Sequence, residues 1–377
     1  MKENKSIKYL LYLILFFIII LLIFYFIEEK ESVLKDEVKN ISSIPTSSAI
    51  PTSSSIPTSS SRPTSTTKIF EEVKTEKPKK KKVNMLNLYE SRKYGYPNLR
   101  EAYVFCYINS ALQLIRSLFS GINYKIPKEI VDFIQYNKAQ GRVLEIEKIL
   151  KLIVPIEEDR KNLFYYTNKI NNELQFTQSD SYEFLEKMLN YCISKNKDLL
   201  SFISFTSKSI EDNTNVFKDN IILTIGNLKN LYKESLFENK INFNTILNDA
   251  ILQPYFSTNL FLDDFSDYLI VHLDLMDEKY KKMLININID DKVQFKTIFD
   301  NNKVYRYNVL SVVCHIGKNF NSGHYVNYSR RPLNKERTEY GWFLYNDIKV
   351  SEISDLNESI KTNQYQPYII LLKRVHL

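Results

Sequence analysis

The sequence predicts an α+β domain, and three observations support this prediction. Apolar residues follow a helical period from about residue 94, strand-like apolar runs dominate after about residue 268, and short turns join several of those runs. Helices that precede strands in this way are typical of an α+β domain with antiparallel pairing. The intervening stretch 195–265 is rich in Asn and Lys, and its signals are too weak to place its elements.

The first helix is predicted to begin at Cys106 and to end near Gly121. Its apolar residues recur at spacings of 3, 4, 3 and 4, which marks one face of a helix. They are Phe105, Ile108, Leu112, Ile115 and Phe119. Cys106, Asn109 and Gln113 follow the same period and predict an adjacent polar face.

A second helix is predicted to follow Gln178-Ser179-Asp180. Asp180 is the expected N-cap, with Glu183 three residues later as its partner in a capping box. The apolar face of this helix comprises Tyr182, Leu185, Met188, Leu189 and Cys192.

Six apolar runs rich in β-branched and aromatic residues predict the strands. They are 268–275, 293–299, 307–316, 324–330, 342–350 and 368–375.

The first ninety residues predict a membrane anchor and a tether. Residues 9–27 form an unbroken run of 19 apolar side chains, and at helical rise such a run spans roughly 28 Å, close to the thickness of the bilayer core. The alternative is a cleaved signal peptide, but no small-residue cleavage site follows the run. The lysines that flank it are balanced and leave its orientation open.

A six-residue repeat with proline at its head occupies residues 45–68, and KPKKKK follows at 77–82. Proline and serine favour an extended tether, and a lysine run is typically solvated or drawn to anionic headgroups. The expected organisation is a tail (1–8), a transmembrane helix (9–27), a disordered linker (28–94) and a folded domain (95–377).

Charge and cysteine usage exclude several classes of protein. The net charge of +7 lies almost wholly in residues 1–94, with 16 Lys and Arg against 10 Asp and Glu, which leaves 35 against 34 for the remainder. A nearly neutral domain argues against nucleic-acid binding. Cys106, Cys192 and Cys314 form no C-x-x-C pair, so the sequence encodes neither a zinc ribbon nor a disulfide framework, and it suits a reducing compartment.

A thiol and an imidazole 218 positions apart point to a chemical function. Cys106 opens the first predicted helix, where backbone dipoles favour a thiolate, although an isolated cysteine is also a common core residue. His324 follows Gly323, which permits close approach of a substrate. His315, His272 and His376 lack such a setting and are expected to be structural.

Asn346 and Asp347 supply a third group near the end of the chain. Asn346 is expected to orient His324 by accepting its Nδ1 proton, as amides do in thiol proteases. Asp347 has two open interpretations, since it could orient the ring in the same way or simply end a strand. Nucleophile, base and orienter together predict a thiol hydrolase.

Six segments extend this prediction to a family. They are FCYINSALQ (105–113), QSDSYEFL (178–185), YLIVHLDL (268–275), NVLSVVCHIGKNFNSGHYVNYSR (308–330), WFLYND (342–347) and PYIILLKR (367–374). In content and order they resemble the boxes of the ubiquitin-specific proteases, from about residue 95 to 375. The resemblance implies a papain-like fold with a helical thumb, an antiparallel β palm and fingers that are reduced or metal-free, because the zinc-binding cysteines of many members are missing.

The resemblance also implies roles for individual residues. Cys106 corresponds to the nucleophile, His324 to the base and Asn346 to the third member of the triad, and no cofactor is required. Asp180 and Glu183 match acidic positions that hold the arginines of the ubiquitin tail. Gly323 and Tyr325 flank the base and are expected to contact the substrate.

The segment before Cys106 departs from the family pattern. The asparagine that stabilises the oxyanion is replaced by Glu101, and a flexible glycine is replaced by Tyr103. Loss of one oxyanion donor costs about 10² to 10³ in rate. Asp274 and Leu275 also replace basic and aromatic family residues.

The expected function is that of a membrane-anchored deubiquitinating thiol hydrolase whose catalytic domain faces the cytosol. Its expected partners are ubiquitin, ubiquitinated proteins and the membrane, with no nucleic acid. The alternatives are a catalytically weak or inactive ubiquitin-binding scaffold, a protease for another ubiquitin-like modifier, and a surface protein whose 45–68 repeat is a glycosylated stalk.

Overall fold

A computed structural model describes most of the chain beyond residue 83. The described residues are 84–98, 104–122, 126–167, 174–211, 215–226, 228, 241–254, 259–277, 281–300, 302–320 and 322–376. The expected tail (1–8), the apolar run (9–27) and the 45–68 repeat lie outside them.

The predicted transmembrane helix requires a correction. Among the helices of the described ranges, none combines the length and the apolar character needed to cross a bilayer. Residues 9–27, on which the prediction fell, are outside those ranges. The structure therefore supports neither the predicted membrane anchor nor the predicted membrane location.

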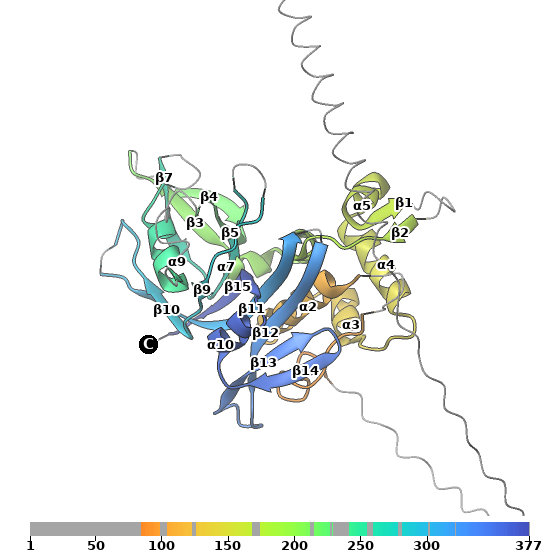
Figure 1. Cartoon of the computed structure of the whole chain (residues 1–377). Coiled ribbons are helices and arrows are strands. Elements are labelled where there is room, and N and C mark those ends of the chain that lie inside the picture. The colour runs from red at the N-terminus through yellow and green to blue at the C-terminus, as the bar shows by residue number, and fades with distance from the viewer. Residues whose placement is uncertain are drawn as a thin grey trace, which may run out of the picture. The chain divides into compact units, whose positions relative to one another are not determined.

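One large sheet forms the centre of the domain (Figure 1). Its strands are β5 (Ile222–Ile225), β8 (Tyr268–Leu273), β10 (Lys292–Phe295), β11 (Tyr305–Asn319), β12 (Ser322–Pro332), β13 (Tyr340–Asn346), β14 (Lys349–Ile353) and β15 (Gln366–Arg374). They pair in the order β14-β13-β12-β11-β15-β8-β5, and β10 adds to β11. Only the pairing of β5 with β8 is parallel among these described strands.

The six predicted strand segments all contribute strands to this sheet, but one prediction was wrong in detail. Residues 342–350 form two strands, β13 and β14, because the chain reverses at Asp347 and Ile348 between the paired residues Asn346 and Lys349. Asp347 has a φ of 53°, the left-handed conformation that Asp tolerates better than most residues in tight hairpin turns. The turn places Asn346 and Asp347 at one edge of the sheet.

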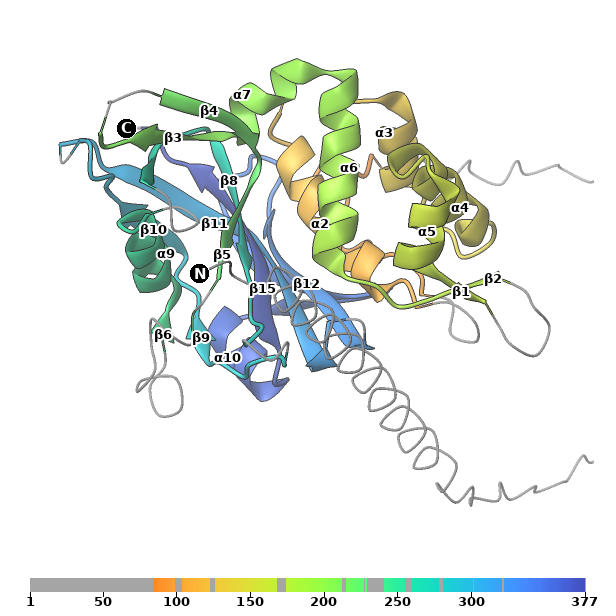
Figure 2. The ribbon, with the colours of Figure 1, turned by 90° about the horizontal axis from the view of Figure 1, so that it is seen from above.

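Five helices gather on one side of the central sheet (Figure 2). They are α2 (Cys106–Phe119), α3 (Lys128–Gln135), α4 (Arg142–Ile153), α5 (Glu157–Phe164) and α6 (Ser181–Lys195). Helix α2 lies against β11, β12 and α6. All 14 of its residues are buried, so the polar face expected on Cys106, Asn109 and Gln113 is enclosed by protein rather than exposed.

The start of α6 confirms the predicted N-cap. Asp180 accepts a hydrogen bond from the backbone N–H of Tyr182 at 2.7 Å. This bond reaches the second helical residue instead of Glu183, the third, which a capping box would use.

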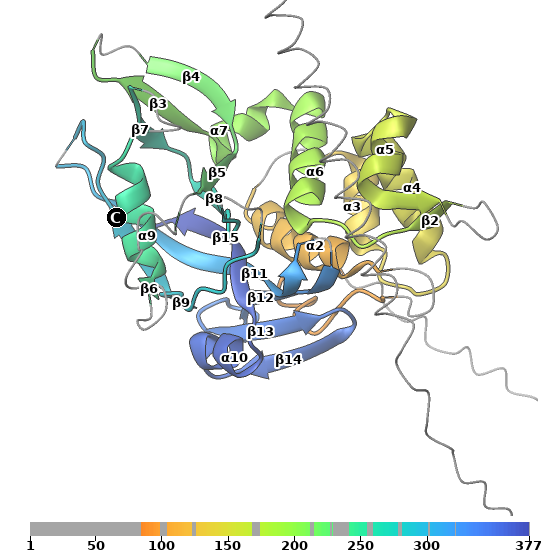
Figure 3. The ribbon, with the colours of Figure 1, turned by 45° about the horizontal axis from the view of Figure 1, so that its top comes forward.

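The stretch 195–265, in which no element could be placed from the sequence, contains a second, smaller sheet (Figure 3). Strands β3 (Phe205–Ser209), β4 (Asn215–Asn220) and β7 (Leu260–Phe265) pair in the order β4-β3-β7. The remaining elements are β1 (Tyr165–Thr167) with β2 (Leu174–Phe176), β6 (Ile241–Asn242) with β9 (Ile287–Asn288), and α7 (Leu200–Ile203), α9 (Phe243–Ile251), α10 (Leu356–Thr362) and a 3₁₀ turn (Lys197–Leu199).

The packed domain begins before residue 95, at the latest at Asn84. Arg116 of α2 donates to the carbonyl oxygens of Met85 (3.2 Å), Ser91 (2.7 Å) and Tyr94 (3.0 Å). Met85 is itself buried in the core. The C-terminal end of the expected linker is therefore part of the folded domain.

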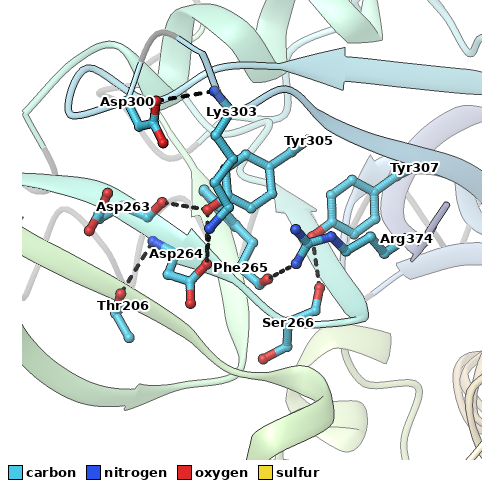
Figure 4. Close-up of polar contacts among 10 residues, drawn as sticks. All are labelled: Thr206, Asp263, Asp264, Phe265, Ser266, Asp300, Lys303, Tyr305, Tyr307 and Arg374. Atoms are coloured by element: carbon cyan, nitrogen blue, oxygen red, sulfur yellow. Dashed lines mark hydrogen bonds and ion pairs between the residues drawn. The ribbon is translucent and has the colours of Figure 1, made fainter. Parts of the chain in front are cut away.

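A polar network joins the small sheet to the central one (Figure 4). The Tyr305 hydroxyl on β11 donates to the Asp264 carboxylate on β7 at 2.8 Å, and Lys303 donates to the same oxygen at 3.0 Å. Burial raises the pKa of Asp264, but the hydrogen bonds from Lys303 and Tyr305 outweigh it and hold that pKa below its ordinary value.

Replacement of Asp264 by Asn is expected to destabilise the domain by no more than about 1 kcal/mol at pH 7, because the pair is partly exposed. Since the native pKa is lowered, the stabilisation is present above the ordinary pKa of an aspartate and is lost as the pH falls through the native value. The difference in urea midpoint between wild type and variant should therefore shrink towards zero in acid. Asp263→Asn is the matched control, and an equal effect of that variant would contradict the role of the network.

Candidate active site

Cys106 is the first residue of α2 and has no exposed surface. Burial is the main influence on its thiol and raises its pKa to about 12. A hydrogen bond from the backbone N–H of Tyr325 lowers the pKa, and the charge of Asp347 raises it further. The thiol thus lies beside the start of β12, the strand that carries His324.

His324 and Asn346 form a direct hydrogen bond. His324 Nε2 and Asn346 Oδ1 are 2.8 Å apart. The ladder between β12 and β13 ends at Asn327 and Tyr345, which leaves Asn346 free to turn its side chain towards the imidazole. The nitrogen that Asn346 contacts is Nε2, whereas the sequence-based expectation was Nδ1. The Nδ1 atom is therefore the nitrogen that remains for a reacting group.

Asp347 contacts neither nitrogen of His324 in the structure. Its carboxylate accepts hydrogen bonds from Asn98 Nδ2 and Asn109 Nδ2, both at 2.9 Å. Asn98 in turn accepts the backbone N–H of Phe105, the residue before the thiol, at 3.0 Å. Of its two predicted roles, Asp347 fits the one at the end of a strand, and from there it orders the approach to Cys106.

Asp180 is half-buried and its carboxylate is already hydrogen-bonded within the protein. Its carboxylate accepts the Tyr368 hydroxyl at 2.6 Å in addition to the capping bond from Tyr182. Burial raises its pKa to about 6, against the effect of the Tyr368 hydrogen bond. Glu183 is also half-buried, and burial raises its pKa although Lys187 opposes the shift.

The two predicted neighbours of the base differ in exposure. Gly323 is exposed and has a φ of 114°; an added Cβ would lie 2.0 Å from the carbonyl oxygen of Ile316, so only glycine fits here. The Tyr325 ring is buried, and its hydroxyl donates to the carbonyl oxygen of Phe320 at 2.9 Å. Glu101 and Tyr103 lie outside the described residues.

Lys282 was not anticipated from the sequence. Its ammonium contacts His315 Nδ1 at 2.7 Å and donates to the carbonyl oxygens of His315 and Gly317, each at 3.3 Å. Burial lowers the pKa of His315 to about 3, so the ring is neutral and its Nε2–H donates to the Ser322 carbonyl at 3.0 Å. Lys282 and His315 thereby hold together the two strands of the hairpin that carries Gly323 and His324. His315 thus has the structural role expected for it.

The described residues form neither a metal site nor a disulfide. Within the ranges that the structure describes, no three His, Cys, Asp or Glu side chains come together as a metal site would require. All three cysteines are free and buried.

Comparisons with known proteins agree with the predicted family. The family model described as ubiquitin carboxyl-terminal hydrolase matches residues 95–371, and no curated protein matches the sequence. Among solved structures, the SAGA Ubp8/Sgf11/Sus1/Sgf73 DUB module bound to ubiquitin aldehyde matches with a TM-score of 0.52 and 14% identity, over 81% of this chain and 72% of that one. A yeast SAGA DUB module that contains a mutant Sgf73 matches with a TM-score of 0.49 and 14% identity, over 81% and 70%.

The family model covers well over half of the chain, and the first of these structures supports the predicted papain-like α+β fold. The chain therefore belongs to the ubiquitin carboxyl-terminal hydrolase family, and it is a cysteine-type deubiquitinase.

Proposed function

We propose that this deubiquitinase hydrolyses the peptide or isopeptide bond after the C-terminal glycine of ubiquitin, with Cys106 as nucleophile, His324 as base and Asn346 as the residue that orients the base. The main support is the 2.8 Å contact between His324 Nε2 and Asn346 Oδ1, next to the strand residue whose N–H reaches the thiol. No second triad of this kind is found among the described residues around the other histidines.

The reaction follows from this arrangement. His324 Nδ1 takes the proton of the Cys106 thiol while the sulfur attacks the glycine carbonyl carbon. The C–N bond then breaks, and the amine leaves with the proton from His324. A water molecule gives a proton back to His324 and attacks the thioester, which releases the ubiquitin carboxylate and restores the thiol.

Two acidic residues are proposed to receive the basic tail of ubiquitin. Asp180 and Glu183 open α6 and are half-buried, so a pairing with arginine would take place in a partly desolvated setting. Gly323 and Tyr325 would contribute backbone groups on either side of His324. The buried thiol also requires that neighbouring segments move before the scissile carbonyl can reach it.

An electrophilic ubiquitin probe tests this function. Ubiquitin with an alkylating group in place of its terminal carboxylate is expected to label the wild-type chain, with a mass increase of one ubiquitin, and to leave Cys106→Ala unlabelled. Cys192→Ala, another buried cysteine, is the control and should be labelled as wild type.

The outcome also separates the alternatives. The burial of Cys106 favours an inactive ubiquitin-binding scaffold as the second candidate, and tight ubiquitin binding without labelling would establish it. Labelling by the probe of another ubiquitin-like modifier in preference to ubiquitin would redirect the proposal to that modifier.

Replacement of Lys282 by Met is expected to lower kcat about tenfold with a smaller change in KM. The variant loses the contacts of Lys282 with His315 and Gly317, so the hairpin that carries His324 is positioned less well. Hydrolysis of a fluorogenic ubiquitin C-terminal amide measures both constants. Lys281→Met removes an adjacent, exposed lysine and should behave as wild type. Equal kinetics of the two variants would show that Lys282 does not position the base.

A further inference from the structure

A pocket of about 380 Å³ lies at the end of α2 opposite to Cys106. The last turn of the helix and Gly121 form one wall, and the first residue of β8 together with the last residues of β12 and β15 form the others. Because α2 has 14 residues, the pocket is separated from the thiol by about 20 Å along the helix axis. It is therefore distinct from the catalytic site.

The pocket wall is strongly cationic. Arg330, Arg337, Lys373 and Arg374 line it, and no carboxylate does. Arg330 lies 3.8 Å from Asp291, and Arg374 donates to the carbonyl oxygen of Phe265. Among the described residues, Lys373 and Arg337 have no acidic partner within 4.0 Å, so their charges remain available to a ligand.

The C-terminus of α2 does not account for these charges. A helix C-terminus attracts cations through its free carbonyl groups, but those of α2 are largely occupied. The Ser120 hydroxyl donates to the Ser117 carbonyl at 3.0 Å, and the Gly121 N–H donates to the Leu118 carbonyl at 3.2 Å. The dipole effect is also limited to a single turn and weak at the surface, so it explains at most one of the four cations.

Tyr268 forms part of the pocket wall with its hydroxyl buried. Tyr268 is 2% exposed, and its hydroxyl is among the buried polar atoms of the described residues that make no hydrogen bond. A Cβ atom placed on Gly121 would lie 1.8 Å from that hydroxyl and 3.7 Å from Lys373 Nζ. The hydroxyl thus packs against Gly121 and is closed to a ligand, whereas the Lys373 ammonium beside it belongs to a residue that lines the pocket.

We propose that this pocket binds a small organic phosphate monoester. Guanidinium groups match the oxygens of a phosphate in bidentate geometry, and the Lys373 ammonium adds a further donor. Leu88, Leu310 and Val375 supply apolar wall for the organic part. The volume lies within the range of small-molecule sites and is many times the roughly 30 Å³ of a single water, so the pocket has room for more than an inorganic ion.

Calorimetric titration of the full-length chain with phenyl phosphate tests the proposal. Saturable binding is expected, and Lys373→Met and Arg337→Met should each weaken it about tenfold, since each removes a charge-assisted contact. Lys151→Met, an exposed lysine on α4, is the matched control and should leave the affinity unchanged.

Two further arms identify the source of the phosphate and separate this site from catalysis. Vesicles of phosphatidylcholine with phosphatidic acid should bind less tightly than phenyl phosphate; tighter binding to the vesicles, again weakened by Lys373→Met, would overturn a soluble ligand in favour of a lipid headgroup. The Cys106→Ala variant should bind phenyl phosphate as wild type does, whatever the result of ubiquitin labelling. Absence of saturable binding, or equal affinities in all variants, would refute the pocket as a phosphate site.

Discussion

Replacement of His324 by Ala is expected to lower kcat/KM for ubiquitin hydrolysis by about 10⁴-fold or more, the scale seen when a member of a catalytic triad is removed. The reason is the state of the thiol. Burial raises the pKa of Cys106 to about 12, so little of the thiol is ionised at neutral pH, and the thiolate is the nucleophile. Without an adjacent base, the reaction depends on that small fraction.

The pH dependence of the variant distinguishes this cause from misfolding. If ionisation of Cys106 limits the His324→Ala variant, its residual rate should rise about tenfold per pH unit between pH 7 and 9, because the thiolate fraction does so below the pKa. A fluorogenic ubiquitin amide provides the rates. His376→Ala, at an exposed histidine near the C-terminus, should keep wild-type kinetics, and a His324→Ala rate within tenfold of wild type would exclude His324 as the base.

Replacement of Arg116 by Met is expected to lower the free energy of unfolding by about 3 to 5 kcal/mol, because several buried carbonyl oxygens lose their donor at once. The Arg116 guanidinium is fully buried and is bonded to three backbone carbonyls of the 85–94 segment and to Gln113 Oε1 at 2.6 Å. Methionine fills a similar volume but donates nothing, so the carbonyls lose their partner, at about 1 to 3 kcal/mol for each one left unsatisfied.

Urea unfolding of the full-length chain measures this loss. The matched control is Arg92→Met, since Arg92 is only half-buried and donates to a single carbonyl, that of Tyr89; a change below about 1 kcal/mol is expected there. A loss of less than about 1 kcal/mol in Arg116→Met would show that the 84–98 segment is held by its apolar contacts and not by the guanidinium.

Local patterns predicted much of the fold. The start of α2 at Cys106 and the Asp180 cap of α6 follow from the period of a helix and from capping chemistry, and both are present. The reversal at Asp347 was missed because apolar residues continue on both sides of it and no glycine marks the turn. The three strands of the small sheet were missed because their segments are short and rich in polar residues.

The sequence predicted only those residues of the candidate site that lie in short motifs with a recognisable reactive side chain. His324 and Asn346 were paired from the sequence, but the choice between the two ring nitrogens depends on how β12 and β13 diverge. The partners of Asp347 were not predicted, because Asn98 lies 249 positions away. Lys282 is likewise 33 positions from the histidine that it contacts, and a single lysine carries no signal of such a distant partner.

The burial of Cys106 has a consequence for its reactivity towards oxidants and alkylating agents. Peroxides and alkylating agents attack the thiolate and need access to the sulfur, whereas this thiol is buried and burial raises its pKa to about 12. The thiol is therefore expected to react slowly with such agents in this conformation. With Cys106 as the proposed nucleophile, oxidative inactivation is expected to be faster during turnover than without substrate.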